Sequence, residues 1–279
     1  MSSNSELKFL KDNENSLYVI HYSCQGLNDD NEGYSPRITS IAALHVASST
    51  MHSFSIHLVA EIKKISRDEI HNHYDDIEAT MLEDFYQFIQ NHQDCYWLHW
   101  NMSNINYGFE TIEHRYRVLT EKQPPKVEDS KKHNLSSIIT EIYGKDCFDL
   151  PRLPSIMACN GGPHRDNLTG AEEAEAFKRK EYLRLHKSTM AKVYFFKSIY
   201  HKVQNRKLKT VRANLPEKVN RIVESLPAKI LALVAVLYSI GQLGYSAYAA
   251  IEYKNTTANS EQPAETNKSS NADADGAGS

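Results

Sequence analysis

The 279-residue chain carries 32 basic and 35 acidic residues, and its formal net charge of -3 excludes a general attraction to nucleic acid or to anionic lipid. The four cysteines are far apart in the sequence and form no CxxC pair, which excludes a disulfide framework and a cysteine-based zinc site. Residues 1–16 are polar and lack the apolar run of a secretory signal, so we expect a polar N-terminal arm there.

Three apolar runs follow this arm. Leu17 to Cys24 (LYVIHYSC) is bounded by Gly26 and a polar loop, which predicts a buried strand. Residues 38–46 (ITSIAALHV) and 53–59 (SFSIHLV) predict two more strands, separated by a turn-like segment. The domain is therefore expected to open with a meander of three strands.

Helical patterns surround a further strand in the next part of the chain. A helix is predicted over 80–91, where Thr80 and Glu83 fit a capping box. The apolar run 95–100 (CYWLHW) predicts a fourth strand, and the residues after it predict a loop that enters a second helix. Strands followed by this alternation predict a mixed α/β sheet covered by helices, in one domain over 17–201. Further helices are predicted over 133–143, from 169 to about 186, and over 190–200.

Residues 230–251 (ILALVAVLYSIGQLGYSAYAAI) contain no charged residue and are long enough to cross a hydrocarbon core of ~30 Å. The segment before them, 202–229, is basic, whereas the tail over 252–279 has few basic residues. By the positive-inside rule we expect a single-pass protein of the inner (cytoplasmic) membrane, with a cytoplasmic domain and a disordered external tail. Small residues four apart within the span would allow a homo-oligomer to form through this helix.

The basic segment before the span has two interpretations that the sequence leaves open. It either contacts anionic lipid headgroups or only sets the topology of the span. The residues that would contact the lipid are Lys202, Arg206, Lys207, Lys209 and Arg212.

The order of the predicted elements resembles the ribonuclease H-like 3'–5' exonucleases of the DEDD class. The end of the first strand, IHYSCQGL, is similar to the family's DxETTGL turn, but His21 and Ser23 stand where its two acids should be. The segment LHWNMSNINYGFETI is similar to the family's AHNASFDxxFL motif, with Asn106 in place of the third acid. The late HxxxxD motif is matched by His186, and Ala191 replaces its acid.

The resemblance, over residues 17–200, implies a ribonuclease H-like mixed sheet flanked by helices and a reaction that depends on two metal ions. Magnesium needs oxygen ligands, chiefly carboxylates, and all four matched acids are replaced. We therefore predict a catalytically inactive domain without a metal cofactor. The alternative is an active nuclease in which Asp29, Asp30 or Glu110 rebuild a site for Mg²⁺ or Mn²⁺. As ordinary residues, they would form a solvated loop and a solvated helix face.

Other clusters have simpler structural explanations. His99 and Trp100 are expected in the core, and the polar run 71–76 (HNHYDD) in a loop rather than at a metal. The segment 159–166 (CNGGPHRD) predicts a turn. Acids near residue 173 are expected to pair with basic residues one helical turn away on an exposed helix. These acids are Glu172, Glu173 and Glu175, and the basic candidates for phosphate contacts are Lys131, Lys132, His133, Lys187, Lys192 and Lys197.

Taken together, these features predict a membrane-anchored exonuclease-like domain that acts by binding single-stranded nucleic acid or a protein partner. By analogy it would serve in signalling or phage defence. The alternatives are an active metal-dependent nuclease and a membrane effector or scaffold whose cytoplasmic domain controls assembly of the span.

Overall fold

Five strands form one mixed sheet in the computed structural model, which describes residues 2–26, 36–104, 107–212 and 226–260. The strand order is β3-β2-β1-β4-β7. β2 runs antiparallel to β1 and β3, whereas β4 runs parallel to β1 and β7. The strands are β1 (Leu17–Cys24), β2 (Ile38–His45), β3 (Met51–Ser55), β4 (Tyr96–His99) and β7 (Lys132–Asn134), and a separate short pair joins β5 (Ser103–Asn104) to β6 (Tyr107–Gly108).

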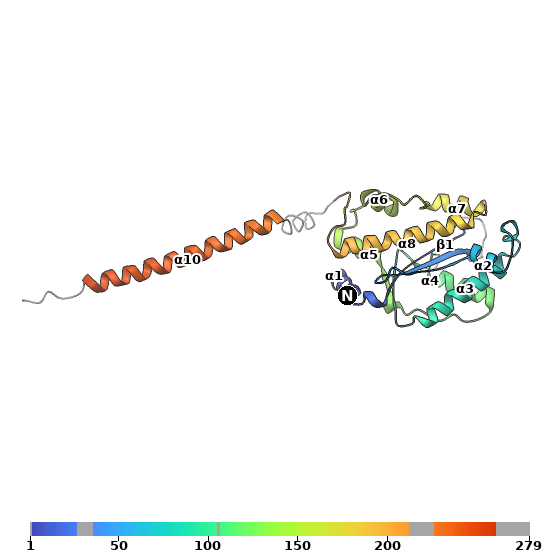
Figure 1. The fold of residues 1–279 in the computed structure, drawn as a ribbon, viewed down its shortest axis with the longest axis horizontal. Coiled ribbons are helices and arrows are strands. Elements are labelled where there is room, and N and C mark those ends of the chain that lie inside the picture. The colour runs from blue at the N-terminus through green and yellow to red at the C-terminus, as the bar shows by residue number, and fades with distance from the viewer. Residues whose placement is uncertain (1, 27–35, 105–106, 213–225, 261–279) are drawn as a thin grey trace, which may run out of the picture. The chain divides into compact units, whose positions relative to one another are not determined.

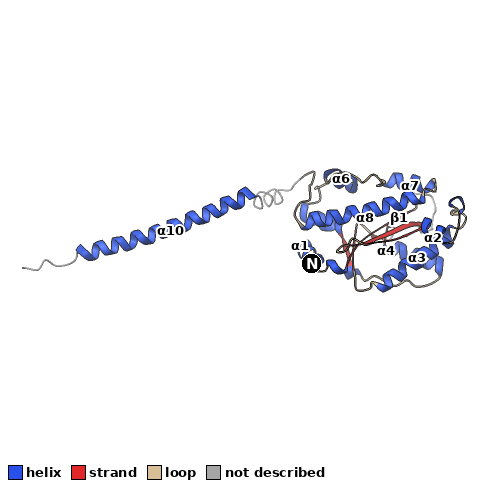
Figure 2. Ribbon diagram, viewed as in Figure 1, coloured by secondary structure: helices blue, strands red, loops and turns tan. Residues whose placement is uncertain are grey.

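Helices lie on both faces of this sheet (Figures 1 and 2), so the predicted mixed α/β sheet covered by helices is confirmed. α8 runs along one face and contacts β1 and β2, while α3 contacts β2 and β3. The helices of the domain are α1 (Ser3–Asp12), α2 (Ile56–Ile62), α3 (Tyr74–Asn91), α4 (Phe109–Thr120), α5 (Leu135–Tyr143), α6 (Arg152–Cys159), α7 (Gly170–Lys178) and α8 (Tyr182–Gln204).

Alternate residues of β1 separate two apolar cores, because successive side chains of a strand point to opposite faces. Tyr18, Ile20 and Tyr22 pack into the core that α3 and α4 cover. Leu17 and Val19 pack into the second core, together with side chains of α1, α5 and α8. The same alternation assigns His21 and Ser23 to the α8 face.

Several boundaries differ from the sequence prediction. The strand predicted over 53–59 ends at Ser55, where α2 begins, so one apolar run supplies both a strand and a helix. α3 begins at Tyr74 instead of residue 80, and the hydroxyl of Thr80 bonds to the Asp76 carbonyl instead of capping a helix. The helices predicted to 186 and from 190 are one continuous helix, α8. The break lies earlier, where Lys180 has a positive φ.

The chain segments on either side of the predicted domain also belong to the folded unit, which extends over residues 1–214. The expected N-terminal arm contains α1, whose Leu7 and Leu10 are buried. Gln204 Nε2 at the end of α8 donates to the carbonyl of Leu7 at 2.6 Å. The backbone of Val211 donates to the Cys147 carbonyl at 3.0 Å, so the start of the basic segment is held against the domain.

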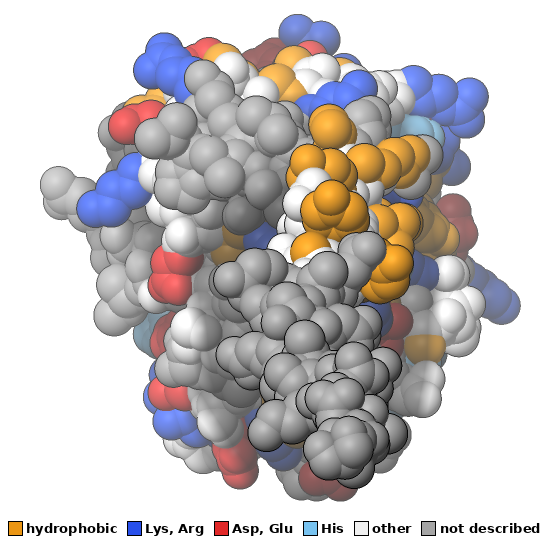
Figure 3. Space-filling view, turned by 90° about the vertical axis from the view of Figure 1, so that its left-hand side faces the viewer, with side chains coloured by type: hydrophobic (Ala, Val, Ile, Leu, Met, Phe, Trp, Pro, Cys, Tyr) orange, Lys and Arg blue, Asp and Glu red, His pale blue; other side chains and the backbone are white. Residues whose placement is uncertain are grey.

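Residues 215–279 form a second unit that contains α10 (Leu226–Ser260). Within it, Lys229–Ile251 has a mean hydropathy of 1.6 and is long and apolar enough to cross a membrane. Its large apolar side chains are more than half exposed. In the view of Figure 3 the largest group of hydrophobic side chains (orange) lies to the right of the centre, with smaller orange patches elsewhere. α10 continues to Ser260, into the stretch expected to be disordered, and the rest of that tail lies outside the described residues.

Candidate functional site

The first two positions equated with nuclease acids lie on the same face of the sheet, under α8. The Ser23 hydroxyl is 2.7 Å from the Thr189 hydroxyl of α8, and the His21 ring contacts Phe196 with its edge at 5.4 Å. Both residues are buried, with 5% of His21 and 2% of Ser23 exposed. Ser23 therefore belongs to a polar cluster inside the domain.

An ion pair between a buried lysine and a partly buried glutamate occupies the centre of this cluster. Lys192 Nζ of α8 lies 2.7 Å from Glu173 Oε1 of α7, and Lys192 is only 4% exposed. The same carboxylate oxygen accepts hydrogen bonds from the hydroxyls of Ser23 (3.1 Å) and Ser188 (2.9 Å). Thr189 also bonds to the Leu185 carbonyl at 3.0 Å. We call Ser23, Glu173, Ser188, Thr189 and Lys192 the Glu173–Lys192 cluster.

The surroundings of the cluster keep its other titratable neighbours uncharged. Burial, reinforced by the Lys192 charge, holds the pKa of His21 well below its usual range, so this imidazole is neutral. Burial and the nearby carboxylates of Glu173 and Glu78 raise the pKa of the Cys24 thiol to about 12. A neutral thiol is a poor nucleophile, and the ion pair remains the charged feature of the site.

Two further matched positions, His186 and Ala191, lie on α8. His186 Nδ1 is 2.7 Å from the Ser40 hydroxyl of β2, and its ring lies 4.9 Å from that of His57. Burial lowers the pKa of His186 to about 4. Ala191 is buried beside Lys192 in the chain, so the missing acid of the HxxxxD motif is followed directly by a lysine. The third matched position, Asn106, lies outside the described residues.

Of the residues proposed for the alternative acidic site, only Glu110 lies among the described residues. Asp29 and Asp30 lie outside them. Glu110 is half exposed in the first turn of α4, and its carboxylate lies 3.5 Å from Lys132 Nζ of β7. The ion pair of Glu110 is thus with a lysine of β7, whereas Glu173 pairs with Lys192 of α8.

The donor set of the cluster does not fit two divalent metal ions. It supplies one carboxylate, whose charge the Lys192 ammonium already balances, together with three hydroxyls. Two Mg²⁺ ions need several carboxylates, and a fixed ammonium would repel them. In the part of the chain that the structure describes, no three His, Cys, Asp or Glu side chains are grouped so that they could hold a metal ion.

Comparison of the chain with models of protein families, with curated proteins and with solved structures finds no match. The function is therefore inferred from two features of the structure. These are the contacts of Glu173 and Lys192 and the hollows on the surface. A charge-balanced polar cluster of this kind can hold elements together, and its donor set of one carboxylate and three hydroxyls does not fit a two-metal centre.

The other clusters named from the sequence are structural. His99 is buried, its Nδ1 accepts the backbone N–H of Met102 at 3.1 Å, and burial lowers its pKa to about 3. Trp100 stacks on Phe196 with ring centroids 5.5 Å apart. Both residues therefore belong to the core, as predicted.

The polar run 71–76 extends from a turn into the first turn of α3, where Asp75 pairs with Arg115 and Asp76 with Lys63. The segment 159–166 turns at Gly161 and Gly162, both with positive φ, as predicted. These two polar runs stabilise local structure.

Sequence reasoning misplaced Glu173. Its neighbour Glu175 does pair with Arg179 one turn later, at 2.7 Å, and Glu172 forms a capping box with Thr169. Glu173 turns inward instead. The signal was available on α8, because Thr189 and Lys192 fall at helical spacing between the buried apolar residues Leu185 and Phe196. Polar residues within a buried stripe require a partner, which proved to be Glu173 and Ser23.

Two basic hollows are present on the surface of the described domain. The α7–α8 groove, of about 390 Å³, lies beside the start of α8 and includes His57, which contacts His186. Its basic side chains outnumber its acids, Asp166 and Glu181. The basic side chains that line it are His57, Arg67, Lys180, Arg184 and Lys187.

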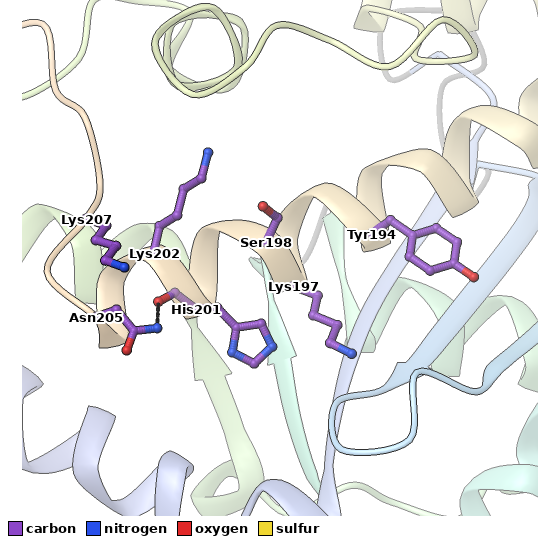
Figure 4. A pocket seen from close by; sticks show the side chains of 7 residues that line it. All are labelled: Tyr194, Lys197, Ser198, His201, Lys202, Asn205 and Lys207. Carbon is purple, nitrogen blue, oxygen red and sulfur yellow. Dashed lines mark hydrogen bonds between the residues drawn. The ribbon is translucent and has the colours of Figure 1, made fainter.

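The second hollow, the α8 groove, has a volume of about 410 Å³ and follows the last turns of α8 (Figure 4). Of the residues expected to contact lipid, it contains Lys202 and Lys207, whereas Arg206 bonds to Asn4 and Arg212 pairs with Asp149. The lining residues are Tyr194, Lys197, Ser198, His201, Lys202, Asn205 and Lys207.

Proposed function

We propose that this protein is a membrane-anchored, catalytically inactive relative of the ribonuclease H-like exonucleases that acts by binding. The observation that carries the proposal is the buried pair of Lys192 with Glu173 next to Ser23 and His21. Where the resemblance requires carboxylates and two metal ions, the chain places its own ammonium ion. An internal cation of this kind supplies charge balance but cannot generate hydroxide from water.

The sheet supports the fold part of the proposal. The strands equated with the family's first four strands occur in the same chain order within one sheet. β1 pairs with antiparallel β2 on one side and with parallel β4 on the other. Such a mixed arrangement places the ends of β1 and β4 at one edge, where the matched residues His21 and Ser23 lie.

Single-stranded nucleic acid is the binding partner that the α7–α8 groove favours. Arg67, Lys180 and Lys187 line this groove and make no ion pair with a described residue, so their charges are available to phosphates. The groove also borders His186, a matched site residue, through His57. A protein partner with an acidic segment would use the same charges, and we keep it as the alternative.

The membrane part of the proposal rests on the length and hydropathy of Lys229–Ile251 and on the basic residues before it. These features support a single span with the domain in the cytoplasm, at the inner membrane. The domain would then bind its partner at the membrane surface.

The test is a metal-dependence assay on the purified full chain with labelled single-stranded DNA and RNA. We expect no nucleotide release in Mg²⁺ or Mn²⁺, and oligonucleotide binding that persists in EDTA. Lys187→Gln should weaken this binding, whereas Lys126→Gln, at an exposed lysine outside the groove, should not. Metal-dependent release that Asp30→Ala or Glu110→Ala abolishes would instead establish the rearranged-site nuclease.

A further inference from the structure

The charged residues that line the α8 groove are all basic. Three lysines and a histidine line it, and no acidic residue does. None of these four side chains forms an ion pair with a described residue. Burial lowers the pKa of His201, so the positive charge of the groove comes from Lys197, Lys202 and Lys207. A hollow with this lining attracts an anion.

The three lysines are held in different ways. Lys202 Nζ donates to the Asn160 carbonyl at 2.6 Å, at the C-terminal end of α6, and it points away from Lys197 in Figure 4. Lys197 Nζ bonds to the Ser49 hydroxyl at 2.5 Å, and Lys207 is exposed without a described partner. Lys197 and Lys207 are therefore the two cations free of any carboxylate or carbonyl partner.

Neighbouring polar groups complete the lining. Asn205 is exposed, and its Nδ2 group, which donates one hydrogen bond to the His201 carbonyl at 2.8 Å, has a second N–H for an oxyanion. Ser198 is exposed on the side of α8 that Lys202 occupies in Figure 4, and the half-exposed Tyr194 ring forms one end of the groove. A phosphate group fits this mixture of ammonium, hydroxyl and amide donors.

The position of the groove in the sequence, shortly before the apolar helix, indicates which kind of phosphate-containing molecule would bind there. The groove ends at Lys207, and the apolar stretch begins at Lys229. Residues 208–228 separate the groove from the apolar stretch along the chain, and even fully extended they reach at most roughly 70 Å. If the apolar helix is inserted in a bilayer, this tether keeps the groove within that distance of the headgroups and so raises their effective concentration. No comparable tether brings nucleic acid or free phosphate to this site.

We propose that the α8 groove binds the phosphate group of an anionic phospholipid, an inference that rests on the membrane anchoring proposed above. Lys197 and Lys207 contact the phosphate, and the second N–H of the Asn205 amide adds a hydrogen bond. Lys202 contributes charge while it stays on the Asn160 carbonyl. Arg206 and Arg212, which are engaged by Asn4 and Asp149, take no part.

The experiment measures how fast individual lysines are acylated in the full chain, reconstituted into nanodiscs. One set of discs contains phosphatidylcholine alone and the other also contains phosphatidylserine. A basic residue near an anionic surface strengthens binding by about fivefold. We expect acylation of Lys197 and Lys207, read by mass spectrometry, to slow by about fivefold or more in the phosphatidylserine discs. The rate at Lys126, exposed outside the groove, should not change.

A matched pair of variants tests the groove itself. Lys207→Gln should raise the phosphatidylserine fraction needed to protect Lys197 by about fivefold. Lys126→Gln removes an exposed lysine that lines neither groove and should leave that fraction unchanged. Equal effects of the two variants would show only a general loss of charge and would overturn the site.

The remaining outcomes separate the two proposals. Protein that enters the discs but shows equal Lys197 rates in both overturns the groove assignment and leaves the anchor intact. Equal protection by inorganic phosphate in phosphatidylcholine discs assigns the groove to free phosphate, and protection by a single-stranded oligonucleotide assigns it to nucleic acid. A chain that does not enter the discs overturns the membrane anchor, and this inference with it.

Discussion

Lys192 Nζ on α8 lies 2.7 Å from Glu173 Oε1 on α7, and this carboxylate oxygen is also bonded by Ser23 of β1. One ion pair therefore joins two helices to the central strand of the sheet. Removal of one member leaves the other charge buried without a partner, which costs about 3–5 kcal/mol.

We therefore expect Lys192→Met to lower the free energy of unfolding by about 3–5 kcal/mol. Fluorescence during denaturation measures this directly, because both tryptophans of the chain, Trp97 and Trp100, are in the domain core. Lys187→Met is the matched control on the same helix, since Lys187 is exposed, and it should change stability by less than about 0.5 kcal/mol.

The double variant Glu173→Gln with Lys192→Met removes both charges together. Its loss of stability should be smaller than the sum of the two single losses, because neither charge is left alone. Strict additivity of the two single changes would contradict a direct interaction between these side chains.

Acid should destabilise the domain through its buried histidines. The pKa of His186 falls from 6.5 to about 4 on folding, because burial disfavours the imidazolium ion. Between these values the unfolded chain binds a proton at His186 that the native chain does not. The free energy of unfolding therefore decreases as the pH falls through this window, by at most about 1.4 kcal/mol per pH unit for this group.

The measurement is the denaturation midpoint between pH 7 and pH 4 for the wild type and His186→Gln. We expect a shallower pH dependence in the variant, with the residual slope due to His99 and His21, whose pKa values burial also lowers. Identical slopes would mean that His186 titrates normally in the folded domain.

A second buried ion pair should stabilise the opposite side of the sheet. Arg115 of α4 donates to both carboxylate oxygens of Glu78 at 2.9 and 2.6 Å, and Glu78 also accepts the backbone N–H of Ile38. Glu78 is fully buried, so we expect Glu78→Gln to cost about 3 kcal/mol or more. Glu83→Gln, which breaks a more exposed pair with Lys122, should cost less than about 1 kcal/mol in the same denaturation assay.

The apolar helix predicts how the protein fractionates. The full chain should sediment with membranes and resist extraction by salt or carbonate, whereas a chain ending at Ser225 should become soluble. Protease added outside intact cells, with any outer membrane permeabilised, should remove only residues after Tyr253 if the domain is cytoplasmic. Digestion of the whole domain would reverse the orientation, and a soluble full-length chain would refute the span.

Local patterns in the sequence were enough to predict four of the five strands of the sheet and the apolar helix, whereas β7 (Lys132–Asn134) lies where the start of a helix was predicted. The apolar runs that begin at Leu17, at residue 38 and at Cys95 form β1, β2 and β4. A buried strand can be recognised in the sequence because its apolar residues are consecutive. The uncharged stretch 230–251 likewise lies within one helix. The ends of the helices and strands were predicted less accurately. The residues that follow Ser55 form α2, and α3 begins six residues before Thr80, because these segments pack against the core.

The sequence by itself determined that His21, Ser23 and Ala191 carry no acid, which depends on residue identity alone. Only the tertiary structure decided what fills the site, because Glu173 and Lys192 meet through the packing of α7 against α8. The sequence around an acid on a helix does not show whether that acid will be exposed or buried. Glu173 differs from Glu175 because α8 covers its side of α7. The α8 groove has the same origin, since its lysines on α8 and after it form one surface only once the chain has folded back.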